Sequence, residues 1–258
     1  MTDTPLLSAH GLSKRYGARI GCQDVSFDLH EGEVLAVVGE SGSGKSTLLR
    51  LLSTELEPNA GAIRYRMRDG AVREVTEMPE ADRRLLFRTE WGFVRQDARE
   101  GLRMNVTAGG NVAEPLMAVG RRHYGHIRAE AVDWLSRVEI DGARVDDNPT
   151  AFSGGMRQRL QIARNLVTNP RLVFMDEPTS GLDVSVQARL LDLIRGLVTE
   201  LGLAVVIVTH DLAVARLLSH RMLVMRAGRV IESGLTDQVL DDPEQAYTQL
   251  LVSSVLAA

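Results

Sequence analysis

The sequence has little cysteine and few aromatic residues. Cys22 is the only cysteine among 258 residues, which excludes an intrachain disulfide and a cysteine-based zinc cluster and favours a reducing compartment. Aromatic residues make up only 4% of the chain. Basic and acidic residues number 30 and 34, a net charge of -4, so charge gives no reason to expect a nucleic-acid partner.

Long apolar runs are also missing. The longest purely apolar stretch, residues 203–208, is far shorter than the roughly 20 residues that cross a bilayer. Residues 1–10 contain Asp3 and lack both the basic and the apolar region of a signal peptide. We therefore expect a cytoplasmic protein without direct membrane insertion.

Lysine is nearly absent, since Lys14 and Lys45 are the only lysines among the 30 basic residues. A chain that uses arginine almost everywhere needs a reason for each lysine. Otherwise the composition is ordinary for a folded globular protein, with 44% hydrophobic and 25% charged residues. The length allows one large or two small domains.

Short runs rich in valine, isoleucine and leucine predict buried parallel strands at residues 34–38, 172–175 and 203–208. Between the last two, apolar residues recur at helical spacing over 184–201, which predicts a strand-helix-strand unit. A helix-prone stretch, 47–52, follows the first run after a glycine-rich loop. This arrangement predicts a second such unit and an α/β core.

The remaining segments are more varied. Alternating patterns predict a smaller antiparallel layer from residues 6–16, 24–29 and 62–67. The region 97–150 shows no convincing strand and is expected to form a helical insertion, with a helix at 127–138 and with Gly109-Gly110 and Asn148-Pro149 punctuating its ends. Residues 241–258 predict a terminal helix whose simplest role is to cap the fold.

A glycine-rich loop lies between the first predicted strand and the helix after it. It fits the pattern G-x-x-x-x-G-K-S and runs Gly39, Glu40, Ser41, Gly42, Ser43, Gly44, Lys45, Ser46, with Thr47 next. Glycines let successive N–H groups turn toward phosphate oxygens, and the helix start adds positive potential. Lysine supplies a mobile charge between the outer phosphates, and the serine hydroxyl is a ligand for Mg²⁺. The pattern predicts a nucleotide-phosphate site.

Two carboxylates close the run 172–175. Asp176 is the candidate partner of Mg²⁺, and Glu177 is the candidate base for an attacking water, because alternation along a strand directs the two side chains differently. A run ending in Asp-Glu is a weak motif alone, but it becomes strong beside a phosphate loop.

A second glycine pair begins another predicted helix. Ser153 stands in the N-cap position, and Gly154 and Gly155 follow it. Two glycines cost about 1 kcal/mol each in a helix, so an ordinary N-cap does not require them. Their bare N–H groups predict a second anion site.

These motifs, followed by Ser180-Gly181-Leu182-Asp183 and Thr209-His210-Asp211, resemble ABC-type ATPase domains in their order along essentially the whole chain. The resemblance implies a P-loop NTPase fold, a RecA-like parallel-sheet core with an antiparallel β layer and a helical insertion. It implies one domain over 1–258, with a nucleotide-binding core at 1–96 and 153–258 and a helical signature subdomain at 97–152. It also implies that the chain hydrolyses ATP with Mg²⁺.

The resemblance further assigns individual residues. It implies that Tyr16 stacks on adenine and that Gln96 touches Mg²⁺ and the water while linking the core to the insertion. Asp183 resembles the aspartate that communicates across a dimer, and His210 resembles the histidine that senses the γ-phosphate.

The residues 152–156 resemble the family signature Leu-Ser-Gly-Gly-Gln with two departures, Phe152 for leucine and Met156 for glutamine. Because serine and the glycines bind the γ-phosphate in this family, we expect function to survive. The partner implied is a second ABC ATPase subunit, either the same chain or a related one, in a head-to-tail pair that encloses two ATP molecules.

The segments that face partners resemble ATPase subunits of carbon-phosphorus lyase systems. That resemblance is carried by residues 88–92, 101–103, 109–111, 122–125, 127–128 and 252–256. It implies that the chain uses ATP to remodel a soluble lyase core complex during organophosphonate catabolism. The radical chemistry would lie elsewhere, since one cysteine cannot hold an iron-sulfur cluster.

Two alternatives stay open. Asp242-Pro243, Tyr247-Thr248 and Leu250-Leu251 resemble the end of dipeptide and oligopeptide importer ATPases. A non-hydrolytic nucleotide-binding scaffold would use the same loop, but it would not need Glu177 and His210.

An arginine-rich segment around Gln96 is either a solvated helix face or a dock for an acidic partner. Its members are Arg83, Arg84, Arg88, Arg95, Arg99 and Arg103.

Overall fold

The computed structural model describes residues 4–256. Packing divides the chain into two compact units, the first formed by residues 1–83 and 202–258 and the second by residues 84–201. The predicted helical subdomain, 97–152, lies inside the second unit and is shorter than it. The ends of the predicted single domain, residues 1–3 and 257–258, lie outside the described residues.

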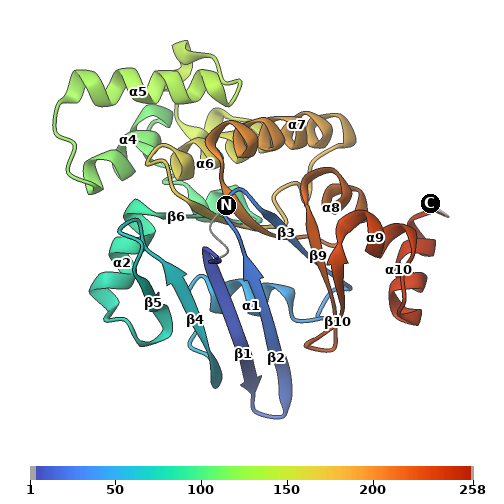
Figure 1. The fold of residues 1–258 in the computed structure, drawn as a ribbon. Helices are drawn as coiled ribbons and strands as arrows, with labels where there is room; N and C mark the ends of the chain where they lie inside the picture. The colour runs from blue at the N-terminus through green and yellow to red at the C-terminus, as the bar shows by residue number, and fades with distance from the viewer. Residues whose placement is uncertain (1–3, 257–258) are drawn as a thin grey trace. The chain divides into compact units, whose positions relative to one another are not determined.

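An antiparallel sheet forms one part of the first unit (Figure 1). Its strands lie in the order β2-β1-β4-β5. Their bounds are Leu7–Tyr16 for β1, Arg19–Leu29 for β2, Ala60–Arg66 for β4 and Val72–Glu74 for β5. This confirms the predicted antiparallel layer. The strand β2 begins earlier than predicted, because its first residues pair with the end of β1.

Parallel strands form the other part of the first unit. Strand β3 (Val34–Val38) pairs in parallel with β8 (Ala204–Val208) and β9 (Arg221–Arg226), and β10 (Arg229–Leu235) pairs with β9 in the antiparallel sense. All five residues of β3 and of β8 are buried, which explains their nearly continuous apolar sequence.

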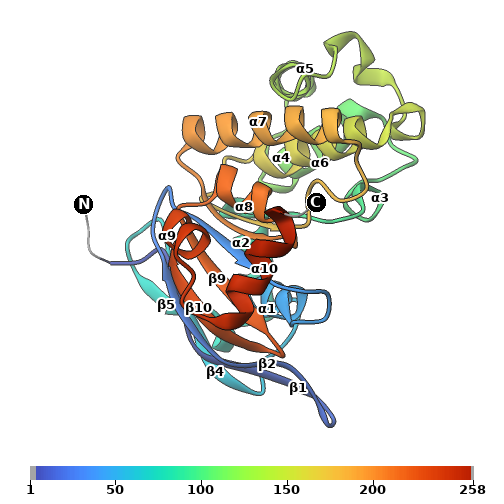
Figure 2. The same cartoon turned by 90° about the vertical axis from the view of Figure 1, so that its right-hand side faces the viewer.

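Helices complete the first unit. Helix α1 (Lys45–Leu52) packs on β8 and on β1 and β2, and α8 (Leu212–Leu218) packs on β3. Near the C-terminus α9 (Thr236–Asp241) and α10 (Ala246–Leu256) lie against each other (Figure 2). A 3-10 turn, Val75–Glu77, follows β5.

The second unit is mainly helical around a short parallel pair, β6 (Trp91–Val94) with β7 (Leu172–Asp176). Helix α4 packs on α5 and on α6, and α6 packs on α7. The helices are α2 (Glu80–Thr89, which begins before the unit boundary), α3 (Ala98–Gly101), α4 (Ala108–Ala118), α5 (Tyr124–Arg137), α6 (Gly154–Leu166) and α7 (Val184–Leu201), with 3-10 turns at Gly142–Asp146 and Pro149–Ala151. Residues 97–150 contain no strand, as predicted.

The expectation that Gly109-Gly110 ends the insertion is wrong, because both glycines lie inside the first turn of α4. A Cβ atom on Gly109 would come within 2.4 Å of the Val145 side chain, so the glycine permits close packing rather than a break. Among the described residues no helix is both long enough and apolar enough to span a membrane.

Candidate functional site

The glycine-rich loop in the first unit joins β3 to α1, as predicted. Its glycines are required by backbone shape, since Gly39 has φ 144° and Gly44, the N-cap of α1, has φ 108°. A Cβ atom on Gly39 would lie 2.2 Å from the Met225 carbonyl oxygen, and one on Gly44 would lie 2.2 Å from the Gly21 carbonyl oxygen. No other residue fits either position without moving a neighbouring backbone.

Lys45 is buried inside this loop, with 5% of its surface exposed. Its Nζ donates hydrogen bonds to the carbonyl oxygens of Gly39 at 2.7 Å and Glu40 at 2.9 Å. The Ser43 hydroxyl is also buried and has no hydrogen-bond partner among the described residues. A compact cation and an unsatisfied hydroxyl in a glycine-rich turn fit an incoming phosphate group.

A residue that sequence reasoning gave no role also holds this loop. Tyr247 of α10 is 6% exposed, and its hydroxyl accepts a hydrogen bond from the Glu40 N–H at 3.0 Å. The Arg226 guanidinium lies 4.8 Å from the centre of the same ring. From the sequence, Tyr247 belonged to a predicted capping helix and to the resemblance to importer ATPases, and neither indicated this contact, because a hydrogen bond over such a sequence separation leaves no local pattern.

Tyr16 ends β1 with 46% of its surface exposed, which leaves a ring face available for a flat ligand. Lys14 lies 6.0 Å from the centre of this ring, and its Nζ donates to the Glu57 carbonyl oxygen at 2.5 Å. The second lysine therefore secures the segment before β4. His210 is exposed directly after Thr209, which follows β8 and bonds to the Val37 carbonyl oxygen.

In the second unit only the first of the two carboxylates lies on the predicted strand. Strand β7 ends at Asp176, and Glu177 lies beyond it with φ 43°, a left-handed conformation that is uncommon outside glycine. The Ser180 N–H bonds to the Glu177 carbonyl oxygen at 3.0 Å and closes a turn. Strand alternation therefore does not extend to Glu177, whose backbone is left-handed.

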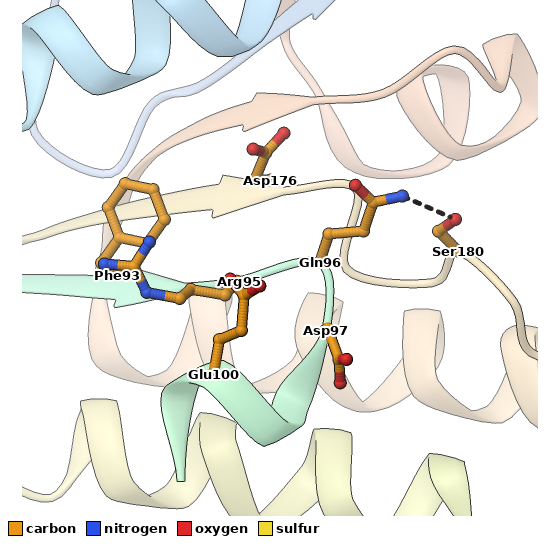
Figure 3. A pocket seen from close by; sticks show the side chains of 7 residues that line it. All are labelled: Phe93, Arg95, Gln96, Asp97, Glu100, Asp176 and Ser180. Atoms are coloured by element: carbon orange, nitrogen blue, oxygen red, sulfur yellow. Dashed lines mark hydrogen bonds between the residues drawn. The ribbon is translucent and has the colours of Figure 1, made fainter.

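A polar pocket of about 400 Å³ lies at this end of β7 (Figure 3). Gln96 and Asp176 both line it, as does Ser180. The Gln96 Nε2 atom donates to Glu177 Oε2 at 3.3 Å and to Ser180 Oγ at 3.1 Å. The second unit thus brings together three of the residues that the sequence singled out, Gln96, Asp176 and Glu177.

Helix α6 begins as predicted, with Ser153 as its N-cap and the Ser153 hydroxyl accepting from the Met156 N–H at 3.3 Å. Ser153 and Gly154 are exposed. A Cβ atom on Gly155 would come within 2.5 Å of the Val186 side chain on α7. Close packing thus gives Gly155 a structural requirement in addition to the predicted anion site, whereas a Cβ atom on Gly154 would make only an ordinary contact with Leu182 at 3.6 Å.

Both departures from the family signature touch one side chain. The Arg144 guanidinium lies 4.5 Å from the centre of the Phe152 ring, and its Nη1 donates to the Met156 sulfur at 3.4 Å. Its Nε also pairs with Asp147 Oδ2 at 2.7 Å. Phe152 and Met156 thus both contact the Arg144 guanidinium.

Asp183 has a local role at the start of α7. Its Oδ1 accepts from the Ser185 hydroxyl at 2.7 Å and from the Val186 N–H at 3.0 Å. The Ser185 hydrogen bond, followed by that from Val186, holds the pKa of the Asp183 carboxyl below its usual value. The carboxylate stays ionised and exposed at this turn.

The described residues contain no group of three or more His, Cys, Asp or Glu side chains arranged to hold a metal ion. Oxygen donors are present in each unit by itself, a hydroxyl on Ser46 in the first and an amide and a carboxylate on Gln96 and Asp176 in the second. Oxygen ligands suit Mg²⁺, which keeps several waters and takes phosphate oxygens as its remaining ligands. Each of these donors is of the kind that a hard cation such as Mg²⁺ prefers.

A phosphate loop and an Asp-Glu pair in an α/β fold define a P-loop nucleoside triphosphatase. The ABC transporter family model matches residues 22–180, and the chain belongs to the ABC family of ATPases. A solved dimeric ABC cassette, MJ0796, has a TM-score of 0.79 at 29% identity, covering 89% of this chain and 98% of the other. A second structure of MJ0796, with ADP and Pi bound, gives 0.78 at 28% identity with the same coverage.

Within the family the chain is similar to one particular protein of Escherichia coli (strain K12). That protein is named as a phosphonates utilization ATP-binding protein, PhnK, and it is 66% identical over 98% of this chain and 99% of its own length. The dipeptide transport ATP-binding protein DppF of the same organism is 38% identical, covering 97% of this chain and 76% of DppF.

Proposed function

We propose that this ABC ATPase is the ATP-hydrolysing subunit of a carbon-phosphorus lyase system for organophosphonate catabolism. The observation that carries the proposal is the 66% identity, over nearly both full lengths, to a protein named for phosphonate utilization. The peptide importer ATPase DppF reaches only 38% and extends beyond the match. The ATPase works in the cytoplasm and remodels a soluble lyase core complex.

The site residues receive roles in ATP hydrolysis. In the first unit the residues 39–47 bind the phosphates, Lys45 neutralises their outer charge, Tyr16 stacks on adenine, and His210 senses the γ-phosphate. In the second unit Glu177 orients and deprotonates the attacking water, and Gln96 contacts both that water and Mg²⁺. The hydrogen bond from Gln96 to Glu177 supports the shared task of these two residues.

Mg²⁺ is assigned to Ser46, Gln96 and Asp176. When bound, it supplies positive charge that neutralises the transferring phosphoryl group. These residues hold the ion through oxygen atoms, while Lys45 binds the phosphates without any metal.

A second ABC ATPase subunit, identical or related, completes each site. Ser153, Gly154 and Gly155 bind the γ-phosphate of the nucleotide held by the other subunit, and Asp183 communicates between the two. The dimeric form of the solved MJ0796 cassette and the exposure of Ser153 and Gly154 support this arrangement. Closure of the pair on two ATP molecules, and reopening after hydrolysis, would drive the partner complex.

The arginine-rich segment is assigned to docking of the lyase core. Arg88 and Arg99 are exposed, and Arg88 borders a groove of about 220 Å³ that Phe87 and Pro115 also line. Arg103 differs, because its guanidinium already pairs with Glu114 at 2.8 Å. Arg88 and Arg99 are therefore the better candidates for binding an acidic partner surface.

Growth and capture test the proposal together. The chain is expressed in a bacterium that lacks its own phosphonates utilization ATP-binding protein and is given an alkylphosphonate as the sole phosphorus source. We expect growth with the native chain, no growth with Lys45→Ala, and recovery of lyase subunits with an affinity-tagged chain. Growth restored only in a strain lacking a peptide importer ATPase, with recovery of membrane permeases, would establish the importer alternative instead.

A charge-reversed variant tests docking separately from catalysis. We expect Arg88→Glu with Arg99→Glu to lose the lyase subunits in the same capture while keeping nucleotide affinity. The matched control is Arg73→Glu, an exposed arginine of β5 in the first unit. Equal loss of the lyase subunits in the control would refute the assignment of docking to this segment.

A further inference from the structure

Gln96 stands in a loop whose start is held by two buried carboxamides of α6. Gln161 is fully buried and Gln158 is 3% exposed. Gln161 Oε1 accepts from the Arg95 N–H at 2.6 Å, and Gln161 Nε2 donates to the Arg95 carbonyl oxygen at 3.1 Å. Both polar groups of the Arg95 peptide backbone, directly before Gln96, are thus fixed by one side chain.

Gln158 strengthens this contact. Its Nε2 donates to the same Arg95 carbonyl oxygen at 3.2 Å, and its Oε1 accepts from Gln161 Nε2 at 3.2 Å. The neighbouring helix α3 fits closely, because a Cβ atom on Gly101 would lie 2.1 Å from Gln161 Oε1. Neither carboxamide can move freely, so the direction in which the chain leaves β6 is fixed.

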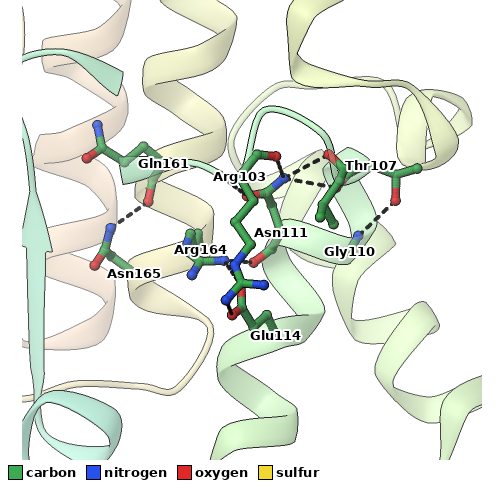
Figure 4. A network of polar contacts seen from close by, with 9 residues as sticks. Arg103, Thr107, Gly110, Asn111, Glu114, Gln161, Arg164 and Asn165 are labelled. Carbon is green, nitrogen blue, oxygen red and sulfur yellow. Dashed lines mark hydrogen bonds and ion pairs between the residues drawn. The ribbon is translucent and has the colours of Figure 1, made fainter. Parts of the chain in front are cut away.

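The far end of the loop is held in the same way (Figure 4). The fully buried Asn111 of α4 accepts from the Arg103 N–H at 2.8 Å and donates to the carbonyl oxygens of Arg103, Val106 and Thr107 at 3.0 to 3.1 Å. Arg164 of α6 bonds in turn to the Asn111 carbonyl oxygen at 2.8 Å. Gln96 lies between two backbone anchors, and α6 takes part in both.

We propose that Gln161 is a positioning residue for ATP hydrolysis, which holds Gln96 at the reacting phosphate by fixing the Arg95 backbone. The proposal rests on the function assigned above to Gln96. The Gln161 carboxamide is fully buried and makes two hydrogen bonds to the Arg95 backbone, which restricts the orientation of the peptide group before Gln96. The Gln96 side chain is thereby held in position to donate to Glu177 and Ser180. Gln161 also lies about 12 Å along α6 from Ser153, so one rigid helix carries both the signature and the Gln96 anchor.

The test compares Gln161→Met, which keeps volume and loses both bonds, with Asn165→Leu as a matched control. Asn165 also lies on α6 and accepts a backbone bond, but from Phe93 at 2.9 Å, inside β6. In nucleotide-free protein we expect amide hydrogen exchange at Arg95 to rise about tenfold or more in Gln161→Met and to stay at the native rate in Asn165→Leu.

Kinetics provide the second measurement on the full-length ATPase. We expect Gln161→Met to lower kcat about tenfold with KM for ATP changed less than about twofold, and the Mg²⁺ concentration for half-maximal rate to rise. In a Gln96→Ala background the same substitution should cause no further loss, because Gln161 acts through Gln96. Losses that multiply in the double variant, or an Asn165→Leu variant with the same kinetic profile, would overturn the proposal.

The Gln158→Met variant provides a second test of the same anchor. Should Gln161→Met fail to fold, Gln158→Met removes one bond to Arg95 and leaves the 2.6 Å bond in place. It should then shift exchange and kcat in the same direction by a smaller factor, and native values would refute the positioning role. An unchanged kcat in Gln96→Ala would refute the function assigned to Gln96, whereas unchanged exchange in Gln161→Met would refute the anchor itself.

Discussion

The contact between the C-terminal helix and the phosphate loop makes a prediction about a single oxygen atom. Tyr247→Phe removes the hydroxyl that accepts from the Glu40 N–H at 3.0 Å and retains the buried ring beside Arg226. The Glu40 carbonyl oxygen is held independently by the Ser43 N–H at 3.1 Å and Lys45 Nζ at 2.9 Å. The Gly39 carbonyl oxygen, which shares a peptide group with the Glu40 N–H, also keeps its bond from Lys45 Nζ at 2.7 Å, so the variant frees the Glu40 N–H alone in an otherwise intact loop.

The magnitude follows from the environment of that bond. A neutral intramolecular hydrogen bond contributes about 0.5–1.5 kcal/mol net, and Glu40 is exposed enough for water to replace the lost acceptor. We expect about 1 kcal/mol, which corresponds to roughly fivefold weaker ATP binding, because the loop must then be ordered when the nucleotide binds.

Equilibrium titration with a fluorescent ATP analogue measures the affinity, and thermal denaturation of the nucleotide-free protein measures stability. Tyr124→Phe is the matched control, since Tyr124 is 74% exposed on α5, and it should leave affinity unchanged. A Tyr247→Phe variant with a lowered melting temperature and native ATP affinity would refute the reasoning, because the bond would then stabilise the fold without ordering the loop.

Three other predictions concern separate features. Glu177→Gln should bind ATP yet release phosphate at least about a hundredfold more slowly, because the amide cannot accept the proton of the attacking water; phosphate release at the native rate would exclude Glu177 as the base. Arg144→Ala should lower turnover several-fold without weakening ATP binding, since the contacts to Phe152 and Met156 are lost, and Arg144→Lys should not restore it because an ammonium lacks the planar fork. Burial raises the pKa of the Cys22 thiol to about 11, so about one molecule in a thousand carries the thiolate at pH 8. Because Cys22 is also fully buried, alkylation of the native protein at pH 8 should be much slower than alkylation of the unfolded protein, and equal rates would contradict the burial argument.

Several elements were predictable because their patterns are local. The strand at Val34–Val38 and the helix at Val184–Leu201 follow from continuous burial and from 3.6-residue periodicity, and the structure gives both with the predicted bounds. The hairpin of β9 and β10 was not predicted, although Ala227 and Gly228 turn between the strands with φ of 48° and 80°. The sequence Ala-Gly is a weak turn signal, and the intermediate burial along β10 gives no clear alternation.

Some residues of the candidate site could likewise be predicted from local sequence patterns, and others could not. Residues inside a motif, such as Lys45 and Asp176, could be found from spacing, since the chemistry of phosphate and Mg²⁺ demands those groups in that order. Tyr247, Arg144 and Gln161 could not, because each acts on a motif from a distant segment, through a single contact or a buried carboxamide. A buried glutamine in a helix has no sequence pattern of its own, and its role becomes visible only when the backbone groups it bonds are known.

The two lysines show how far composition can be taken. Lys45 is enclosed by its own loop, with Nζ within 2.9 Å of two carbonyl oxygens, and a guanidinium with its wider planar fork would not enter that space without displacing the backbone. Lys14 binds a single carbonyl oxygen, that of Glu57, from an exposed strand end where room is not limiting. Steric confinement therefore explains the retention of lysine at position 45, and at position 14 nothing in the structure excludes arginine. Replacement by arginine should abolish ATP binding at position 45 and preserve it at position 14, so the scarcity of lysine marks a functional residue only where the surroundings are closed.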